Sequence, residues 1–394
     1  MKKLLLIGWF FYPKLGGAET VMLNQAKYFV DQGYDVSVLT SGEEDGKLGK
    51  VKIYRRNYIN TSIEFNSAAV VKDLEKIFAV SRPDIVHFHN GSYPVASNDI
   101  PAGVKNIVSL FDYFKKNGSV VIEHTHNAQL ERPDLTEPLR NLKWDCLICV
   151  SDYVRRSWQK LGTGAKKIEV VHNGIELKLF ENSEKSLEMA KLKKSGEQII
   201  FFPARVISMR RAMISEQKNF ILLLRACKIL LGKGLDHFRL IAILNRGLQT
   251  ENTKKAYDEL DREIKNNNLG QHIDFLPEVL PAEMPCYYAA ADIVCIPSIN
   301  ETFGLVYIEA MAAGKIAIAS NTGGPKEYIK NGENGFLVDP QDPNDLALVL
   351  EKLVTDNKLR DRISLNGATT VREFSALKTM EKIEQIYIEL LEAK

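Results

Sequence analysis

Two glutamates near residue 300 carry the strongest signal for chemistry in the sequence. Glu301 lies in a polar loop between an apolar run, Ile293–Ile296, and a helix predicted over 303–313, and Glu309 lies within that helix. A carboxylate in so apolar a helix is costly to bury unless it is paired, which favours a function for Glu309. An anion at the helix start would meet free backbone N–H groups and the positive end of the helix dipole. Because flanking carboxylates can accept hydrogen bonds from hydroxyls, the stretch predicts a site for an anion joined to a polyol, as in a sugar nucleotide.

The same two carboxylates allow other assignments. Glu301 and Glu309 could form the acid and base of a hydrolase. They could also be structural, with Glu301 at the helix start and Glu309 on an exposed helix surface. The apolar neighbours of Glu309 argue against the structural assignment.

Two cations follow another predicted strand, 198–203. Arg205 ends this strand, and Lys218 precedes the next predicted helix. A pair of cations at one strand–helix junction suits a diphosphate, whose charge must be neutralised. A solvated basic loop is an equally supported alternative, because the intervening segment, 206–217, is itself rich in charge.

A glycine pair follows the first predicted strand, 4–8. Gly16 and Gly17 precede a helix predicted over 19–32, and paired glycines let the backbone approach a phosphate or sugar closely. A tight turn, with Glu19 favoured by the helix dipole, explains the same pattern and, taken alone, explains it better. The stretch has neither a GxGxxG nor a GxxxxGK[ST] motif, which argues against a dehydrogenase or a kinase-like ATPase.

Four histidines stand at or just after the ends of two predicted strands: His87 and His89 on 84–89, and His124 and His126 on and beyond 120–124. Strand ends of a doubly wound sheet are where sites form, and alternate residues of a strand share a face. Such a group could bind zinc, although strand-end histidines are more often hydrogen-bonded core or rim residues. Only Glu123 is close in sequence as a further ligand, so we expect no metal site.

Strand-like segments such as 35–40 and helix-like segments such as 152–161 and 343–355 alternate along the chain, which predicts an α/β fold with doubly wound parallel sheets. A charged segment near 173–195 interrupts this alternation, and a new strand follows at 198–203. We therefore predict two domains, 1–172 and 173–374, and a final amphipathic helix over 375–394.

Length and composition agree with this division. The chain has 394 residues, 45% of them apolar, which suffices for two cores. Its 52 basic and 50 acidic residues give a net charge of +2, which argues against a dedicated nucleic-acid binder. We expect no disulfide framework, because the five cysteines are scattered and the CxxC of Cys146 and Cys149 lies in an apolar run. With no stretch long enough to span a membrane, we expect a cytoplasmic protein.

Taken together, these segments resemble the retaining glycosyltransferase family 4. The most specific part is the E-x7-E signature from Glu301 to Glu309 in its context of Pro297-Ser298, EAMAAG at 309–314 and GGP at 323–325. Supporting matches are GGAE at 16–19, PDIVHFH at 83–89, ICVS at 148–151, HNGIE at 172–176 and AADIVCIPS at 290–298. The resemblance runs through nearly the whole chain. It implies the GT-B fold, in which two Rossmann-like domains face a central cleft.

The resemblance also implies roles for residues of the C-terminal domain. Glu309 would bind the nucleotide ribose, and Glu301 would face the donor sugar. Arg205 and Lys218 would neutralise the diphosphate as it leaves. Backbone amides would contact the sugar and diphosphate, namely those of Phe303, Gly304 and Leu305.

On the N-terminal side, the resemblance implies that Gly16 and Gly17 line the cleft. It also places a donor-facing histidine at the end of the strand from Val120. The spacing favours His126 but leaves His124 open. The helix over 375–394 would cross back onto the N-terminal domain.

Three features depart from the family pattern. Ala204-Arg205 replaces the usual Gly-Arg, and the gap 206–217 before Lys218 is longer than typical. Leu244-Asn245-Arg246-Gly247 replaces a glycine-rich turn. The longer gap affects the role of Lys218, and the altered turn affects contacts with the nucleotide base.

The resemblance thus implies a retaining, metal-independent transfer of a hexosyl unit from a UDP- or GDP-sugar, without a cofactor, to a saccharide, lipid-linked or small-molecule acceptor. Cell-envelope or exopolysaccharide synthesis is the expected setting, with peripheral contact to the inner membrane face as an option. Two alternatives stay open. One is an epimerase or hydrolase of sugar nucleotides with the same fold, and the other is a non-catalytic carbohydrate- or nucleotide-binding protein.

Overall fold

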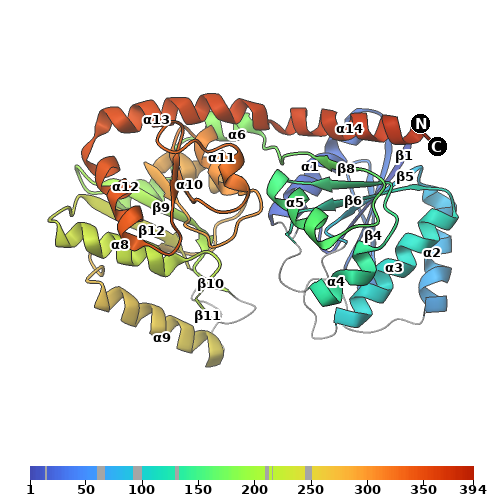
Figure 1. The fold of residues 1–394 in the computed structure, drawn as a ribbon, viewed down its shortest axis with the longest axis horizontal. Coiled ribbons are helices and arrows are strands. Elements are labelled where there is room, and N and C mark those ends of the chain that lie inside the picture. The colour runs from blue at the N-terminus through green and yellow to red at the C-terminus, as the bar shows by residue number, and fades with distance from the viewer. Residues whose placement is uncertain are drawn as a thin grey trace. The chain divides into compact units, whose positions relative to one another are not determined.

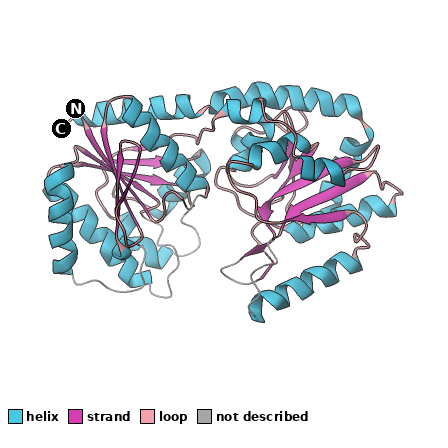
Figure 2. Cartoon of the chain, turned by 180° about the vertical axis from the view of Figure 1, so that it is seen from behind, coloured by secondary structure: helices cyan, strands magenta, loops and turns pink. Residues whose placement is uncertain are grey.

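The computed structural model describes residues 1–13, 16–59, 67–91, 100–128, 133–208, 213–214, 216–244 and 251–394. They form two compact units, which are considered separately (Figures 1 and 2). Unit 1 comprises Met1–Gly174 and Ala376–Lys394, and unit 2 comprises Ile175–Ser375. Both ends of the chain therefore belong to unit 1.

Unit 1 is built on an eight-stranded sheet with the order β3-β4-β2-β1-β5-β6-β7-β8. Its strands are β1 (Lys3–Gly8), β2 (Asp35–Thr40), β3 (Gly46–Leu48), β4 (Val51–Arg55), β5 (Ile85–His89), β6 (Val120–Thr125), β7 (Cys146–Cys149) and β8 (Ile168–Val170). The strands pair in parallel except for the β3–β4 hairpin. The central strands are almost entirely buried, which explains the nearly continuous apolar sequences of β1 and β7.

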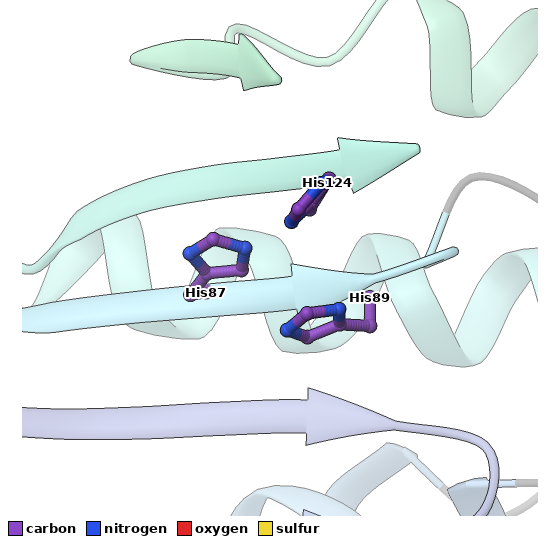
Figure 3. A group of neighbouring side chains, drawn as sticks. All are labelled: His87, His89 and His124. Carbon is purple, nitrogen blue, oxygen red and sulfur yellow. The ribbon is translucent and has the colours of Figure 1, made fainter. Parts of the chain in front are cut away.

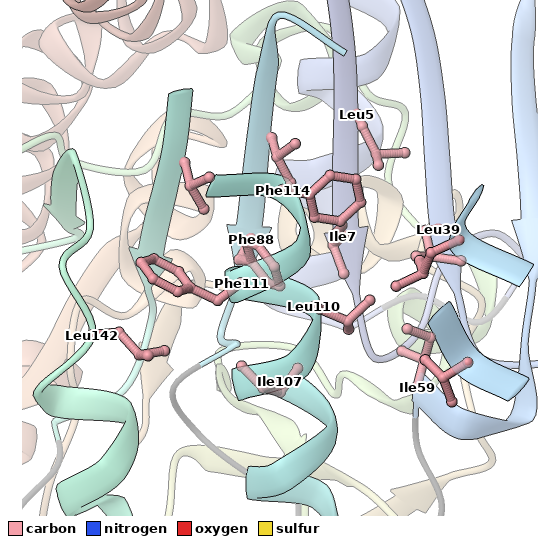
Figure 4. Packing of buried hydrophobic residues seen from close by; sticks show 14 of the residues in the cluster. Leu5, Ile7, Leu39, Ile59, Phe88, Ile107, Leu110, Phe111, Phe114 and Leu142 are labelled. Carbon is pink, nitrogen blue, oxygen red and sulfur yellow. The ribbon is translucent and has the colours of Figure 1, made fainter. Parts of the chain in front are cut away.

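Helices lie on both faces of this sheet: α1 (Gly17–Asp31), α2 (Ser67–Ser81), α3 (Ile100–Lys116), α4 (Pro133–Arg140), α5 (Asp152–Leu161) and α14 (Ala376–Glu392). Alternation along β5 separates the faces, since Phe88 joins the apolar cluster formed with α2 and α3. Figure 4 shows Leu110 and Phe114 of α3 directed at this cluster. His87 and His89 project to the other face, where they meet residues of α1 and α14.

Unit 2 contains a six-stranded, all-parallel sheet with the order β13-β12-β9-β14-β15-β16. The strands are β9 (Gln198–Arg205), β12 (Phe238–Ile243), β13 (Ile273–Leu276), β14 (Ile293–Cys295), β15 (Ile316–Ser320) and β16 (Phe336–Val338). Its helices are α6 (Leu177–Glu181), α7 (Leu187–Leu192), α8 (Phe220–Gly232), α9 (Glu251–Asn266), α10 (Met284–Ala290), α11 (Leu305–Ala312), α12 (Pro343–Thr355) and α13 (Asn357–Thr370). Among the described residues there are also short 3-10 helices: Asn57–Ile59, Gly324–Glu327 and Val371–Phe374.

The predicted α/β fold is confirmed, with several local corrections. The helix predicted from Phe303 begins at Leu305, because Gly304 adopts a left-handed conformation (φ 86°, ψ 68°) that ends the preceding loop. The charged segment near 173–195 contains two short helices, α6 and α7. Elements that the sequence analysis did not predict are β3, α4, β16, α13 and a hairpin of β10 (Ile207–Ser208) with β11 (Met213–Ile214).

Two further expectations concern the whole chain. Within the described residues, no helix is long and apolar enough to cross a membrane. All five cysteines are free, and Cys146 and Cys149 are buried in β7, where burial raises the pKa of the Cys146 thiol to about 12. A thiol so resistant to ionisation is structural rather than reactive.

Candidate functional site

The loop between β14 and α11 is held in one shape by two tyrosine hydroxyls. Tyr307 donates to the Ile296 carbonyl at 2.6 Å, and Tyr328 donates to the carbonyls of Phe303 and Gly304 at 2.7 and 3.1 Å. Gly304 is required here, since a Cβ would lie 2.4 Å from the Tyr307 ring and its φ is positive. The N-terminus of α11 is thereby fixed at the carboxyl end of the sheet.

The glycine pair after β15 packs against the same loop. A Cβ on Gly323 would lie 2.1 Å from the Glu301 carbonyl oxygen, and one on Gly324 would lie 2.0 Å from that of Thr302. The Gly324 N–H donates to the Glu301 carbonyl at 2.9 Å. The backbone of the glutamate loop therefore rests directly on the backbone of the glycine turn.

Lys218 and Glu301, predicted separately from the sequence, form an ion pair with Nζ and Oε2 2.7 Å apart. Lys218 ends the loop before α8, and the neighbouring Gln217 carbonyl accepts a hydrogen bond from the Ile299 N–H at 2.9 Å. The two loops thus lie side by side. Glu301 does not cap α11, whose N-cap residue is Gly304.

Arg205 emerges at the carboxyl end of β9, between β12 and β14 in the sheet. Its guanidinium Nη2 lies 2.5 Å from Oε1 of Glu278, just beyond the end of β13. Both side chains are largely exposed. Sequence reasoning missed Glu278, and the only signal for it was an acid two residues after a strand.

Glu309 is not an exposed helical residue, because it accepts a hydrogen bond from the Tyr288 hydroxyl at 2.6 Å. Burial raises the pKa of Glu309 above its ordinary value, and the Tyr288 hydrogen bond partly offsets this rise. Tyr288, which lies fully buried in α10, was also missed in the sequence. The pairing satisfies the expectation that a carboxylate in this apolar helix needs a partner.

In unit 1, Gly16 and Gly17 lie at the start of α1, with Gly16 as the N-cap residue in an extended conformation. The Glu19 carboxylate folds back over the turn, so that a Cβ on Gly16 would lie 2.6 Å from Glu19 Oε2. Burial raises the pKa of Glu19, and the backbone N–H groups of Glu19 and Gly16 partly offset the rise. The described residues thus show a helix start with Glu19 in its first turn, as the structural alternative from the sequence requires.

The four histidines gather on one face of the sheet in unit 1. His89 and His124 are register partners on β5 and β6, and Figure 3 shows the rings of His87, His89 and His124 close together. The ring centroids of His124 and His126 are 4.5 Å apart, and those of His89 and His126 are 5.4 Å apart, in stacked arrangements. Burial lowers the pKa of each imidazole, that of His126 to about 3. The cluster is therefore neutral at pH 7.

Three of these rings, those of His87, His89 and His124, bring nitrogens within 4.8 Å of one another, so a metal must be considered. The geometry argues against one. His87 and His89 are stacked with an interplanar angle of 22°, so their in-plane lone pairs run side by side instead of converging. Both nitrogens of His89 already have partners, His126 and Gln25. The absence of a metal at this cluster stays a prediction.

Each of the two units has a Rossmann-like, mainly parallel sheet. Known structures share this architecture over their full length. Sucrose-phosphate synthase from Thermosynechococcus elongatus superimposes with a TM-score of 0.81 at 19% identity, covering 100% of both chains. HepE from Anabaena, solved in complex with UDP and glucose, has a TM-score of 0.74 at 18% identity, covering 98% of this chain and 100% of that one. The fold is GT-B.

The family descriptions follow the same division. "Glycosyltransferase Family 4" matches residues 15–179, and "Glycosyl transferases group 1" matches residues 187–370. The chain belongs to glycosyltransferase family 4.

Two individual relatives share 30% and 24% of their residues with this chain over the matched stretches. A D-inositol 3-phosphate glycosyltransferase of Nocardioides is 30% identical over 229 residues, which are 56% of this chain and 48% of the relative. The match thus spans about half the length of that relative. An uncharacterized glycosyltransferase of Methanocaldococcus jannaschii is 24% identical over 94% of both chains.

Proposed function

We propose that this protein is a retaining glycosyltransferase that moves a hexosyl unit from a UDP- or GDP-sugar to a saccharide, lipid-linked or small-molecule acceptor. The observation that carries the proposal is the Lys218–Glu301 pair next to the fixed N-terminus of α11. A cation, a carboxylate and a helix N-terminus at one sheet edge suit a phosphate joined to hydroxyl groups. Family membership and the UDP complex of HepE support a nucleotide-sugar donor.

Arg205 and Lys218 are assigned to the diphosphate. Each is held by a carboxylate, Glu278 and Glu301 respectively, so each cation is placed before a donor binds. A diphosphate would take over these cations by exchanging one anionic partner for another. The released Glu301 carboxylate would then accept hydrogen bonds from the donor sugar.

Glu309 is assigned to the nucleotide ribose. Tyr288 holds its Oε2, which orients the carboxylate and leaves Oε1 for ribose hydroxyls. Burial raises the pKa of Glu309. Each ribose hydroxyl that donates to the carboxylate would oppose this rise, because it favours the ionised form. Backbone amides at the start of α11 are assigned to the sugar and diphosphate, those of Phe303, Gly304 and Leu305.

The reaction then needs no residue as nucleophile. The bond from the anomeric carbon to the diphosphate oxygen breaks, and the acceptor oxygen attacks from the same face. The acceptor proton passes to the departing phosphate oxygen. Arg205 and Lys218 stabilise the charge that develops on this group, so we propose that the transfer is metal-independent.

The setting of the reaction is part of the proposal. We propose that the acceptor is built into cell-envelope or exopolysaccharide material and that the enzyme works in the cytoplasm, with peripheral contact to the inner membrane face. Co-sedimentation with anionic vesicles tests this contact. Recovery of all the protein in the supernatant at low salt would contradict it.

The test of the function is an assay of nucleotide diphosphate release from UDP- and GDP-hexoses, with and without an acceptor panel. Arg205→Ala and Lys218→Ala should each lower the rate by about 100-fold or more, with circular dichroism unchanged. Lys228→Ala, which removes an exposed lysine of α8, should retain full activity.

Other outcomes would assign a different function. Donor turnover without any acceptor would indicate an epimerase or hydrolase, and donor binding without turnover would indicate a non-catalytic binding protein. Full activity in both variants would refute the assignment of the two cations. Inversion at the anomeric carbon, read from the product by NMR, would refute retention.

A further inference from the structure

A buried hydrogen-bond chain runs through unit 1 from α14 to the end of β6. The Gln25 Nε2 of α1 donates to the Tyr387 hydroxyl at 2.7 Å, and the Gln25 Oε1 lies 2.6 Å from His89 Nε2. His89 Nδ1 in turn lies 3.1 Å from His126 Nε2. Each of these side chains is at most 8% exposed, so water does not compete for the bonds.

The positions of the protons along the hydrogen-bond chain follow from the side-chain amide of Gln25. Because the Gln25 Oε1 can only accept, His89 must carry its proton on Nε2. His89 is neutral, so its Nδ1 has a lone pair and accepts. The proton in the 3.1 Å contact then belongs to His126 Nε2, which leaves His126 Nδ1 without a proton.

The other end of the hydrogen-bond chain, at Tyr387 and His87, agrees with these proton positions. The Gln25 amide donates to Tyr387, whose hydroxyl in turn donates to His87 Nδ1 at 2.7 Å. Every bond from His87 to His126 thus pairs one donor with one acceptor. If the Gln25 amide were flipped, donor and acceptor would change places in every one of these bonds. The orientation of the amide therefore determines the tautomer of His126.

We propose that Gln25 is a positioning residue that holds His126 in the Nε2–H tautomer, so that His126 Nδ1 can only accept a hydrogen bond. His126 would then bind a sugar by accepting from a hydroxyl, and it would not supply a proton. This inference rests on the proposed function, because the donor-facing role of His126 is what the resemblance to family 4 implies. The tautomer itself depends only on unit 1.

The alternative occupant of this region is a metal ion on His87, His89 and His124, the three rings of the cluster whose nitrogens approach one another. The two possibilities differ in an observable way. A metal on either nitrogen of His89 would replace one of its two hydrogen bonds, because Nε2–H donates to Gln25 Oε1 and the lone pair of Nδ1 accepts from His126. Metal content and tautomer are therefore measured on the same sample.

The experiment uses the full chain with ¹⁵N-labelled histidine rings, in which two-bond ¹H–¹⁵N correlations report the tautomer of each ring. The His126 signal is identified by its loss in His126→Asn. We expect the Nε2–H tautomer at His126 in the wild type and in Gln25→Glu, which keeps an acceptor for His89. Gln25→Met has no acceptor and should lose the single tautomer. Gln32→Met, at an exposed position after α1, is the matched control and should behave as the wild type.

Kinetics provide the second measurement. Gln25→Met should raise the KM for the donor by about tenfold with a smaller effect on kcat, Gln25→Glu should restore it, and Gln32→Met should not change it. An Nδ1–H tautomer at His126 in the wild type, or an unchanged tautomer in Gln25→Met, would overturn the proposal. So would stoichiometric zinc in the purified protein. Because the NMR measurement needs no donor, it can succeed even where the transfer assay fails, which separates this inference from the proposed function.

Discussion

At the residue scale, each charged group assigned to the donor in unit 2 already has a partner within the unit. Lys218 pairs with Glu301 across 83 positions of sequence, and Arg205 pairs with Glu278 across 73. The sequence indicated Lys218, Glu301 and Arg205 because motifs and strand ends mark residue types and spacing. It did not indicate the pairs, since each depends on two distant loops meeting at one sheet edge.

His124 presents the opposite case, a buried polar side chain whose ring nitrogens accept or donate no hydrogen bond among the described residues. A buried N–H without a partner costs about 1–3 kcal/mol. His124→Phe keeps an aromatic ring against its neighbours and removes the N–H. We therefore expect the variant to be as stable as the wild type at pH 7, or more stable by up to about 2 kcal/mol.

The measurement is urea unfolding followed by tryptophan fluorescence. All three tryptophans, Trp9, Trp144 and Trp158, are buried in unit 1, so the signal reports that unit. His124→Asn keeps a polar group at the site and should show no gain. A loss of more than about 2 kcal/mol in His124→Phe would mean that the imidazole has a stabilising partner.

At the element scale, the glycine turn after β15 sets the position of the loop that bears Glu301. Gly323→Ala would place a Cβ 2.1 Å from the Glu301 carbonyl oxygen at a φ of +74°. Because backbone cannot yield as a flexible side chain can, we expect the loop to move, with a loss of at least about 2 kcal/mol in stability. Transfer activity should fall with it, since Lys218 and Glu301 would separate.

Gly332→Ala is the matched control for this change. Gly332 has the same φ of +74°, but nothing lies within 4 Å of its Cβ position. The control therefore carries the backbone strain alone, about 1 kcal/mol, and should keep its activity. Thermal melts and the transfer assay on both variants give the comparison. Equal losses in the two would show that strain, not contact with Glu301, decides the effect.

The elements themselves were predictable to different degrees. Strands such as β2 and helices such as α5 and α12 have the predicted bounds, because their apolar spacing and their caps, Ser151 and Asp342, agree. The helix α13 was not predicted, because it buries only Ile363 and Gly367 and so lacks an apolar stripe. The helix forms because of its tertiary packing, since Gly367 lets it approach Met311 of α11 closely.

At the scale of the whole molecule, unit 1 is closed by the last segment of the chain. Tyr387 of α14 stacks on Phe29 of α1 with centroids 4.9 Å apart and bonds to Gln25 and His87. The sequence predicted the helix from its amphipathic pattern. The polar contacts beneath it were not predictable, because they join residues up to 362 positions apart.

The same buried cluster makes unit 1 sensitive to acid. Its four histidines have pKa values well below 6.5 in the folded state, that of His126 about 3, whereas unfolded histidines titrate near 6.5. Below pH 6.5 the unfolded chain therefore binds more protons than the folded one, and stability falls as pH falls. Asp145, whose pKa is lowered by Lys115 and Lys166 against the cost of burial, loses its contribution only below its ordinary value of 3.8. The raised pKa of Glu19 acts in the opposite sense, because the folded carboxyl keeps its proton to a higher pH than the unfolded one. Four histidines outweigh this single group between pH 6.5 and 5.

Each neutral histidine contributes a limiting slope of about 1.4 kcal/mol per pH unit, so four together contribute about 5.5 kcal/mol per unit, roughly the whole stability of a small domain. We expect the urea midpoint of the tryptophan signal to fall steeply between pH 6.5 and 5. His124→Phe should reduce the slope by about a quarter, because it removes one of the four titrating groups. A midpoint that stays constant over this range would show that the histidines take up protons while folded, which would contradict the lowering of their pKa values by burial.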